Sequence, residues 1–210
     1  RLLDHLRRHS VDLSQVNKIV LDEADELLRL GFVEDVETML EALAGDHQLL
    51  LFSATMPARI RALTRRYMKE PREITVQPER VTLENIDQVI VDTREETKLD
   101  KLSELLNKYQ PYLAMVFCHT KQKVSQVTFA LAHRGYLVDE LHGDLTQTQR
   151  NLVMRRFREA KLQILVVTDI AARGLDIEGV THVFNYDLPQ DAEWYIHRIG
   201  RTGRAGAKGL

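Results

Sequence analysis

The sequence lacks the features that mark several classes of protein. Cys118 is the only cysteine among 210 residues, which excludes an internal disulfide and fits a reducing, cytoplasmic location. No apolar run approaches the roughly 20 residues of a membrane span, and no signal peptide is visible, so we expect no contact with a membrane. With 29 basic and 31 acidic residues the net charge is −2. Any binding of nucleic acid must therefore depend on local basic clusters.

A further absence concerns phosphate binding. None of the ten glycines is followed by lysine, so the sequence has no P-loop, the turn whose Gly-Lys-Thr or Gly-Lys-Ser end cradles the phosphates of a nucleotide. Yet the stretch VLDEADELL runs from apolar residues directly into the carboxylates of Asp22, Glu23 and Asp25. Acidic residues at a strand end often hold a metal ion beside a phosphate. The acids of a nucleotide-hydrolysing site are present without the loop that binds the nucleotide.

Short apolar runs alternate with helical patterns along the chain, which indicates an α/β fold with parallel sheets. Apolar residues spaced three and four apart predict two amphipathic helices, one with Val33, Val36, Leu40 and Leu43 and one with Leu99, Leu102, Leu105 and Leu106. Helix boundaries are expected at Pro57 and before Pro111. The predicted strands are 17–21, 48–52, 73–76, 86–91, 113–117, 137–141, 163–167 and 180–185.

A change of pattern around residues 77–85 predicts a domain boundary. The stretch QPERVTLEN is polar, contains a proline and has neither the helical nor the strand period. The part before it, residues 1–76, has too few strands for a complete doubly wound domain. The part after it, residues 86–210, can form a full sheet.

Polar residues follow five of the predicted strands, where an open parallel sheet binds its ligands. Each could instead cap the helix that follows, because Ser, Thr and Asp are common N-cap residues. Five such ends together favour a site that both domains share. The residues are Asp22, Glu23 and Asp25; Ser53 and Thr55; His119 and Thr120; His142, Gly143 and Asp144; and Thr168 and Asp169.

The acids after the first strand allow two interpretations. Asp22 suits magnesium coordination, since a hard cation bound to phosphates takes one or two protein carboxylates. Glu23 could then orient or deprotonate an attacking water. The alternative is a helix N-terminus at which acids complement the dipole.

The stretch YIHRIGRTGRAG combines arginines with glycines. Arg198, Arg201 and Arg204 recur at intervals of three, and glycines lie between them. Arginine forks suit phosphate oxygens, and glycine allows the backbone to approach a ligand or a partner domain. A nonspecific basic patch would explain the charges but not this spacing.

Together these motifs resemble the DEAD-box family of ATP-dependent RNA helicases, in superfamily 2, over essentially the whole chain. DEAD lies at 22–25, SAT at 53–55 and HGDLTQTQR at 142–150, where Gln147 and Arg150 complete the pattern. TDIAARGLDI is similar to the family's motif V and HRIGRTGR to its motif VI. The resemblance implies two RecA-like domains, the first truncated at its N-terminus, because the family's Q motif and P-loop precede DEAD.

The resemblance also implies roles for individual residues. Asp22 would hold Mg²⁺ through water, Glu23 would position the hydrolytic water, and Arg201 and Arg204 would be arginine fingers on the γ-phosphate. The remaining roles are contact with the ribose of ATP for Asp176, coupling of nucleotide state to domain closure for Asp25, Ser53, Thr55 and His197, and RNA or interdomain contacts for Gly143, Arg150, Thr168 and Arg173.

Two functions therefore stay open for these residues. The first is part of an ATP-dependent RNA helicase that uses ATP and Mg²⁺ to unwind short RNA duplexes through backbone contacts, without sequence preference. The second is a binding module that contacts RNA or a partner without hydrolysing ATP. A Gly-Lys-Thr or Gly-Lys-Ser loop upstream of Arg1 in the parent reading frame would favour the first.

Overall fold

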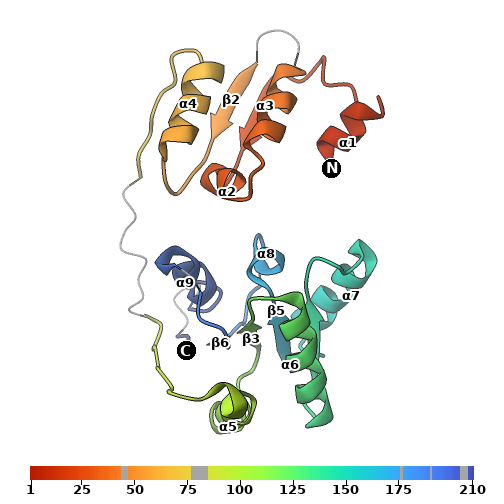
Figure 1. Cartoon of the computed structure of the whole chain (residues 1–210), viewed down its shortest axis with the longest axis vertical. Helices are drawn as coiled ribbons and strands as arrows, with labels where there is room; N and C mark the ends of the chain where they lie inside the picture. The colour runs from red at the N-terminus through yellow and green to blue at the C-terminus, as the bar shows by residue number, and fades with distance from the viewer. Residues whose placement is uncertain (44–46, 77–84, 176, 190, 204–207) are drawn as a thin grey trace. The chain divides into compact units, whose positions relative to one another are not determined.

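The computed structural model describes residues 1–43, 47–76, 85–175, 177–189, 191–203 and 208–210, and the chain divides into two compact units (Figure 1). The first unit is Arg1–Gln77 and the second is Pro78–Leu210. That residues 77–85 form the linker between the two domains stays a prediction, since only Asn85 of this stretch is among the described residues.

The first unit contains a small parallel sheet and several helices. Strands β1 and β2 pair in register from Lys18 with Gln48 to Leu21 with Leu51. Helix α4 begins directly after Pro57, as predicted. The elements are α1 (Leu2–Arg7), β1 (Lys18–Leu21), α2 (Ala24–Arg29), α3 (Val33–Glu41), β2 (Gln48–Leu51) and α4 (Ala58–Tyr67).

The core of the first unit lies on one face of this sheet. Buried residues of α3 and α4, among them Val36, Leu40 and Leu63, pack against alternate strand residues such as Leu21 and Leu51. This confirms the apolar face predicted for α3. On the other strand positions, Val20 is 57% exposed, and Phe52 at the end of β2 is 55% exposed. Among the described residues, helices therefore cover the sheet on one face only.

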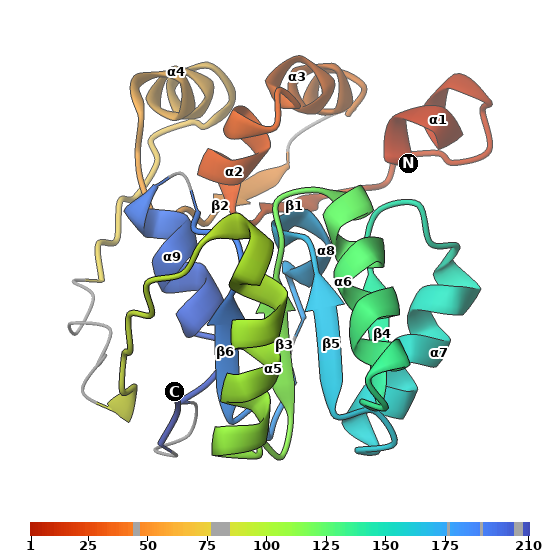
Figure 2. The same cartoon turned by 60° about the horizontal axis from the view of Figure 1, so that its bottom comes forward.

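The second unit is a doubly wound sheet with helices on both faces (Figure 2). Its strand order is β4-β5-β3-β6, and all three pairings are parallel. The elements are the 3-10 helix η2 (Glu95–Thr97), α5 (Lys98–Tyr109), β3 (Ala114–Phe117), α6 (Lys121–His133), β4 (Val138–Leu141), α7 (Gln147–Arg158), β5 (Ile164–Val167), α8 (Asp169–Ala172), β6 (His182–Asn185) and α9 (Ala192–Ile199).

Alternation along the central strands separates two cores. Val116 and Val166 face α5 and α6, whereas Phe117 and Val167 face α7 and α8. All residues of β3 and β5 are buried. Their continuous apolar runs fit this burial, since strands of a parallel sheet covered on both faces need apolar side chains on both sides. The parallel arrangement brings the carboxyl ends of β3, β4 and β5 to one edge of the sheet.

Two predicted strands are wrong. Residues 73–76 and 86–91 are not strands, and of the second stretch only Ile86 forms an isolated bridge, with Gly209. Their apolar residues suggested a buried face, but Val76 is 82% exposed and Ile90 is 94% exposed. No described strand pairs with either stretch beyond that bridge. Residues with β-propensity do not form a strand here because no neighbouring strand is available to pair with them. The other six predicted strands are confirmed, each with slightly narrower bounds.

Within the described residues, no helix is both long and apolar enough to cross a membrane.

Candidate active site

The acidic turn after β1 is held in an unusual backbone conformation. Glu23, the N-cap of α2, has a φ of 50° in the left-handed region, which costs a non-glycine residue about 1 kcal/mol or more. Asp22 Oδ1 accepts a hydrogen bond from the Glu23 backbone N–H at 2.9 Å, and the Ala24 N–H donates to the Phe52 carbonyl at 3.0 Å. Ala24 is buried, whereas the side chains of Asp22 and Glu23 are exposed. The turn thus presents two carboxylates from a fixed backbone.

Asp25 joins this turn to the end of β2. Its Oδ2 accepts hydrogen bonds from the backbone N–H of Thr55 at 2.7 Å and from the Thr55 hydroxyl at 2.8 Å. Ser53 Oγ accepts from the Asp25 backbone N–H at 3.0 Å and donates to the Thr55 carbonyl at 2.6 Å. The structure therefore brings together three of the four predicted coupling residues.

These hydrogen bonds favour the ionised form of Asp25. Partial burial alone would raise the pKa of its carboxyl group, but the hydrogen bonds from Thr55, together with those involving Ser53 and its own backbone, outweigh burial and lower the pKa below its ordinary value. Asp25 is therefore ionised at neutral pH. Both carboxylate oxygens of Asp25 accept hydrogen bonds, because the Glu26 N–H also donates to Oδ1 at 3.2 Å.

In the second unit, the side chain of Arg198 on α9 is almost fully buried, with 2% exposure. Its Nε and Nη2 donate to the two carboxylate oxygens of Asp169 at 2.5 and 2.7 Å. Nη1 donates to Asn185 Oδ1 at 3.1 Å and also to the Asp187 carbonyl. The guanidinium carbon lies 5.1 Å from the centre of the Phe117 ring. This arginine ties α9 to α8 and to the ends of β3 and β6.

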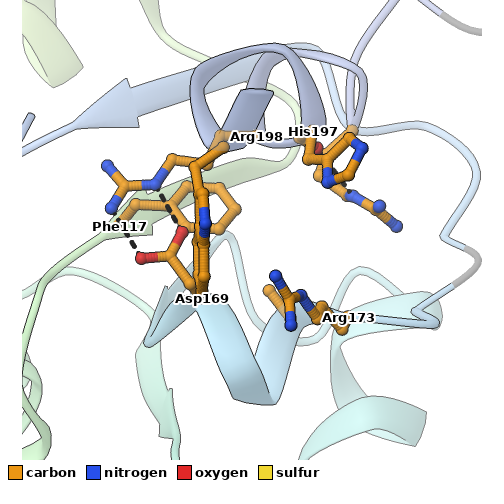
Figure 3. Close-up of a pocket in the computed structure, with 8 residues that line it drawn as sticks. Phe117, Asp169, Arg173, His197 and Arg198 are labelled. Carbon is orange, nitrogen blue, oxygen red and sulfur yellow. Dashed lines mark hydrogen bonds and ion pairs between the residues drawn. The ribbon is translucent and has the colours of Figure 1, made fainter. Parts of the chain in front are cut away.

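A small hollow opens between α8 and α9 beside this ion pair. Figure 3 shows Arg198 and Asp169 joined at one side of the hollow and Arg173 and His197 at the other. Its lining is Phe117, Asp169, Ala172, Arg173, Trp194, His197, Arg198 and Arg201. Three residues with predicted roles, Arg173, His197 and Arg201, thus line one hollow.

Arg201 is held by backbone carbonyls of its own unit. Its Nη1 donates to the Leu175 carbonyl at 2.8 Å, and its Nε donates to the His197 carbonyl at 3.1 Å. A phosphate that binds this guanidinium would share it with these carbonyls or replace them. The other predicted finger, Arg204, and the predicted ribose contact, Asp176, lie outside the described residues.

Two of the predicted RNA-binding residues, Gly143 and Thr168, lie just after strands, whereas Arg150 lies on α7 and Arg173 ends α8. Gly143 follows β4, is exposed, and has open space where a Cβ would be. Thr168 is the N-cap of α8. Arg150 Nη2 donates to the Ala171 carbonyl at 2.6 Å, so this arginine links α7 to α8. The terminal nitrogens of Arg173 are buried.

The turn after β3 is part of the framework. The backbone N–H of His119 donates to Asp187 Oδ2 at 3.0 Å, and Lys98 Nζ donates to Oδ1 at 3.0 Å. Thr120 caps α6 by accepting from the Lys123 N–H at 3.2 Å. Cys118 is fully buried, and burial, with the nearby Asp187 carboxylate, raises the pKa of its thiol to about 12. A thiol with this pKa is inert at neutral pH.

The described residues contain no group of three or more His, Cys, Asp or Glu side chains that could hold a metal ion. An exposed carboxylate such as Asp22 fits a different arrangement. Mg²⁺ keeps several of its waters and is often bound through one or two carboxylates together with substrate phosphates.

The sequence matches the family model of the helicase conserved C-terminal domain over residues 97–206 and that of the DEAD/DEAH box helicases over residues 1–63. It is 50% identical over 210 residues to the DEAD-box ATP-dependent RNA helicase CshA of Bacillus subtilis (strain 168). The chain belongs to the DEAD-box helicase family. Its two parallel-sheet units correspond to the RecA-like domains of these helicases.

Other DEAD-box proteins are also similar to this chain in sequence or structure. The ATP-dependent RNA helicase CshA of Listeria monocytogenes is 51% identical over 210 residues. The solved structure of S. cerevisiae Dbp5 bound to RNA and ADP BeF3 has a TM-score of 0.85 and 36% identity, and the match covers 99% of this chain and 55% of that chain. A DEAD box protein from Methanococcus jannaschii has a TM-score of 0.57 and 42% identity, with 100% of this chain and 56% of that chain covered. This DEAD-box chain spans 42% of the Bacillus subtilis relative.

Sequence reasoning missed two features of this DEAD-box chain. It noted Asp169 as a polar strand end and Arg198 as one of three arginines, but it did not pair them, although an acid after a buried strand needs a partner when it is itself buried. The motifs also assigned no role to Trp194. Trp194 is half-buried and lines the hollow, where the Arg173 guanidinium carbon lies 4.2 Å from its ring centre.

The hydrogen bonds to Asp25 lead to a prediction on its titration. Because the pKa of Asp25 is lowered in the fold, its stabilising contribution is present above the ordinary carboxyl pKa of about 4 and is lost as the pH falls through the folded value. Thr55→Val removes the hydroxyl bond, so the pKa of Asp25 should rise and the unfolding free energy at pH 7 should fall by about 1 kcal/mol. Carboxyl-carbon NMR titration and urea unfolding measure the two effects. As a control, Thr38→Val removes a hydroxyl that donates to the Glu34 carbonyl on an exposed face. An unchanged pKa in Thr55→Val would contradict the assignment.

Proposed function

We propose that this chain is part of an ATP-dependent RNA helicase that couples ATP binding and hydrolysis to local unwinding of RNA without sequence preference. The observation that carries the proposal is the acidic turn at the end of β1. Its strained Glu23 and exposed Asp22 are fixed next to the Asp25–Ser53–Thr55 network. A backbone held in a costly conformation at exposed carboxylates is typical of functional sites.

In the proposed hydrolysis, the acids act on the metal ion and on water. Asp22 would hold Mg²⁺ through a bound water, and the ion when bound would neutralise charge on the phosphates. Glu23, exposed next to Asp22, would orient the attacking water and accept its proton. The ionised carboxylate of Asp25 would hold the Ser53–Thr55 turn in position through its hydrogen bonds to Thr55.

The arginines of the second unit would act on the same ATP. Arg201 and Arg204 would stabilise the charge that develops on the γ-phosphate in the transition state, and Asp176 would accept a hydrogen bond from the ribose. His197 lies on α9, and its carbonyl accepts a hydrogen bond from Arg201, which follows the end of this helix. We propose that it works with Asp25, Ser53 and Thr55 to couple the nucleotide state to closure of the protein on RNA.

RNA would be contacted through its backbone by Gly143, Arg150 and Thr168. The open space beside Gly143 allows a close approach of the phosphate chain, and Arg150 carries a guanidinium suited to phosphate. Backbone contacts carry no sequence information, which supports unwinding of any short duplex. The predicted contact between Arg173 and RNA is not part of this proposal, because the terminal nitrogens of this side chain are buried.

According to the binding-module interpretation, the 210 residues alone do not hydrolyse ATP. We expect the isolated chain to hydrolyse ATP at a negligible rate, because it contains no Gly-Lys pair and therefore no lysine and backbone cradle for the β- and γ-phosphates. Phosphate release with and without RNA measures this rate. Turnover comparable to that of a complete two-domain helicase would show that phosphate binding here does not depend on a P-loop.

The arginine roles can be separated in a longer protein that joins this chain to a Gly-Lys-Thr or Gly-Lys-Ser loop. Arg201→Ala and Arg204→Ala should each lower the rate constant of ATP hydrolysis by at least about a hundredfold, given the 10³–10⁵ usually supplied by an arginine finger. ATP affinity should change much less, because the charge appears mainly in the transition state. Steady-state kinetics measure both quantities.

Arg150→Ala serves as the contrasting variant. It should weaken RNA binding and reduce the salt dependence of that binding by about one ion, while hydrolysis without RNA stays nearly unchanged. Arg158→Ala, at an exposed position of the same helix α7, controls for loss of charge alone. The role assignment is refuted if Arg150→Ala abolishes hydrolysis without RNA and Arg201→Ala leaves it intact.

A further inference from the structure

Two arginine contacts join helices α8 and α9 beside the hollow. Arg198 on α9 reaches back to Asp169 on α8, as a buried bidentate ion pair. In the opposite direction, Arg173 at the end of α8 places its guanidinium carbon 4.2 Å from the ring centre of Trp194 on α9. Each helix therefore holds the other through one arginine, and the two contacts flank the same hollow.

The environment of Trp194 supports a fixed position for its ring. Its backbone N–H donates to the N-cap residue Asp191 at 2.9 Å, so that the residue sits in the first turn of α9. The ring is half-buried and lines the hollow with His197 and Arg201. A guanidinium over an indole face gains attraction from the ring quadrupole, and tryptophan is the best of the aromatic residues in this respect.

The burial of Arg173 indicates what the contact does. Its terminal nitrogens are buried, so in this structure they are not presented to a ligand in solvent. An arginine side chain loses much rotamer freedom when it is fixed, and stacking on a rigid ring compensates for part of that loss. Arg173 thus acts on the relative position of α8 and α9. Helix α9 carries His197, and Arg201 follows directly after its C-cap Gly200.

We propose that Arg173 and Trp194 form a stacked pair whose role is to position the first turn of α9, and through it the guanidinium of Arg201, in place of a direct contact between Arg173 and RNA. Both members are positioning residues. The role of Arg201 rests on the proposed function; the stacked pair itself does not.

Trp194 is the only tryptophan of the chain, so its fluorescence reports on the pair directly. In the 210-residue chain, Arg173→Ala should uncover one face of the indole. We therefore expect emission at longer wavelength and stronger quenching by acrylamide, whereas Arg158→Ala at an exposed position of α7 should leave both unchanged. Emission and quenching that do not respond to Arg173→Ala would overturn the proposal.

The positioning role is tested in the longer protein described above. Trp194→Leu fills much of the space without an aromatic face, and Trp194→Phe keeps one. Trp194→Leu and Arg173→Ala should each lower kcat for ATP hydrolysis by roughly two- to fivefold, the effect of losing one partly exposed cation–π contact. KM for ATP should not change, and the double variant should lose no more than either single one. Trp194→Phe should restore most of the activity.

RNA binding separates this role from the alternative. If Arg173 contacts phosphate directly, Arg173→Ala reduces the salt dependence of binding to a labelled single-stranded oligouridylate by about one ion, whereas Trp194→Leu does not. That result would overturn the proposal. An unchanged salt dependence in both variants would support it. Should the longer protein fail to hydrolyse ATP at all, the proposed function fails, and the emission of Trp194 still decides whether the stacked pair exists.

Discussion

The second unit depends on the buried ion pair between Arg198 and Asp169. Burying a guanidinium costs several kcal/mol unless its donors are satisfied and an opposite charge lies in contact. Here both carboxylate oxygens of Asp169 accept from Arg198, and Asn185 and the Asp187 carbonyl accept from the third nitrogen. One residue of α9 is thereby tied to α8 and to the residues at and after the end of β6.

This ion pair also constrains two residues to which we assign roles, one on α9 and one just after it. His197 precedes Arg198, and Arg201 follows it by less than one helical turn, so their backbone positions are determined by the same buried anchor. Arg201 gains further order from the Leu175 carbonyl. Preorganised groups act on developing charge without a reorganisation cost at the moment of reaction. A rigid α9 would therefore suit the arginine finger that we propose for Arg201.

In the first unit, a different interaction holds the residues at the strand ends in position. Its sheet has helices on one face only among the described residues, so apolar packing offers less restraint at the strand ends. Hydrogen bonds to the ionised carboxylate of Asp25 take this role, because charge-assisted bonds are stronger than neutral ones. They connect the turn after β1 with the Thr55 region after β2 and leave Asp22 and Glu23 exposed.

The sequence allowed the architecture and part of the site to be predicted. Runs of apolar residues identify β3 and β5 because buried parallel strands are continuously apolar, and the SAT motif places Thr55 with Asp25. The same reasoning fails at 73–76, where an apolar alternation has no neighbouring strand. The pairing of Arg198 with Asp169 joins residues that are 29 positions apart, so no local period or motif reveals it. Only the fold brings the two together.

A double-mutant cycle on this ion pair tests the account most directly. Urea unfolding of the second unit can be followed by the emission of Trp194, which lies in this unit. Arg198→Met keeps most of the packing but leaves the Asp169 charge unpaired, so we predict a loss of about 3–5 kcal/mol in the free energy of unfolding. Asp169→Asn should also destabilise strongly, and the double variant should lose much less than the sum of the two. A loss below about 1 kcal/mol for Arg198→Met, within the usual range of a surface substitution, or additive losses in the cycle, would contradict the claim that this ion pair holds α8 and α9 together.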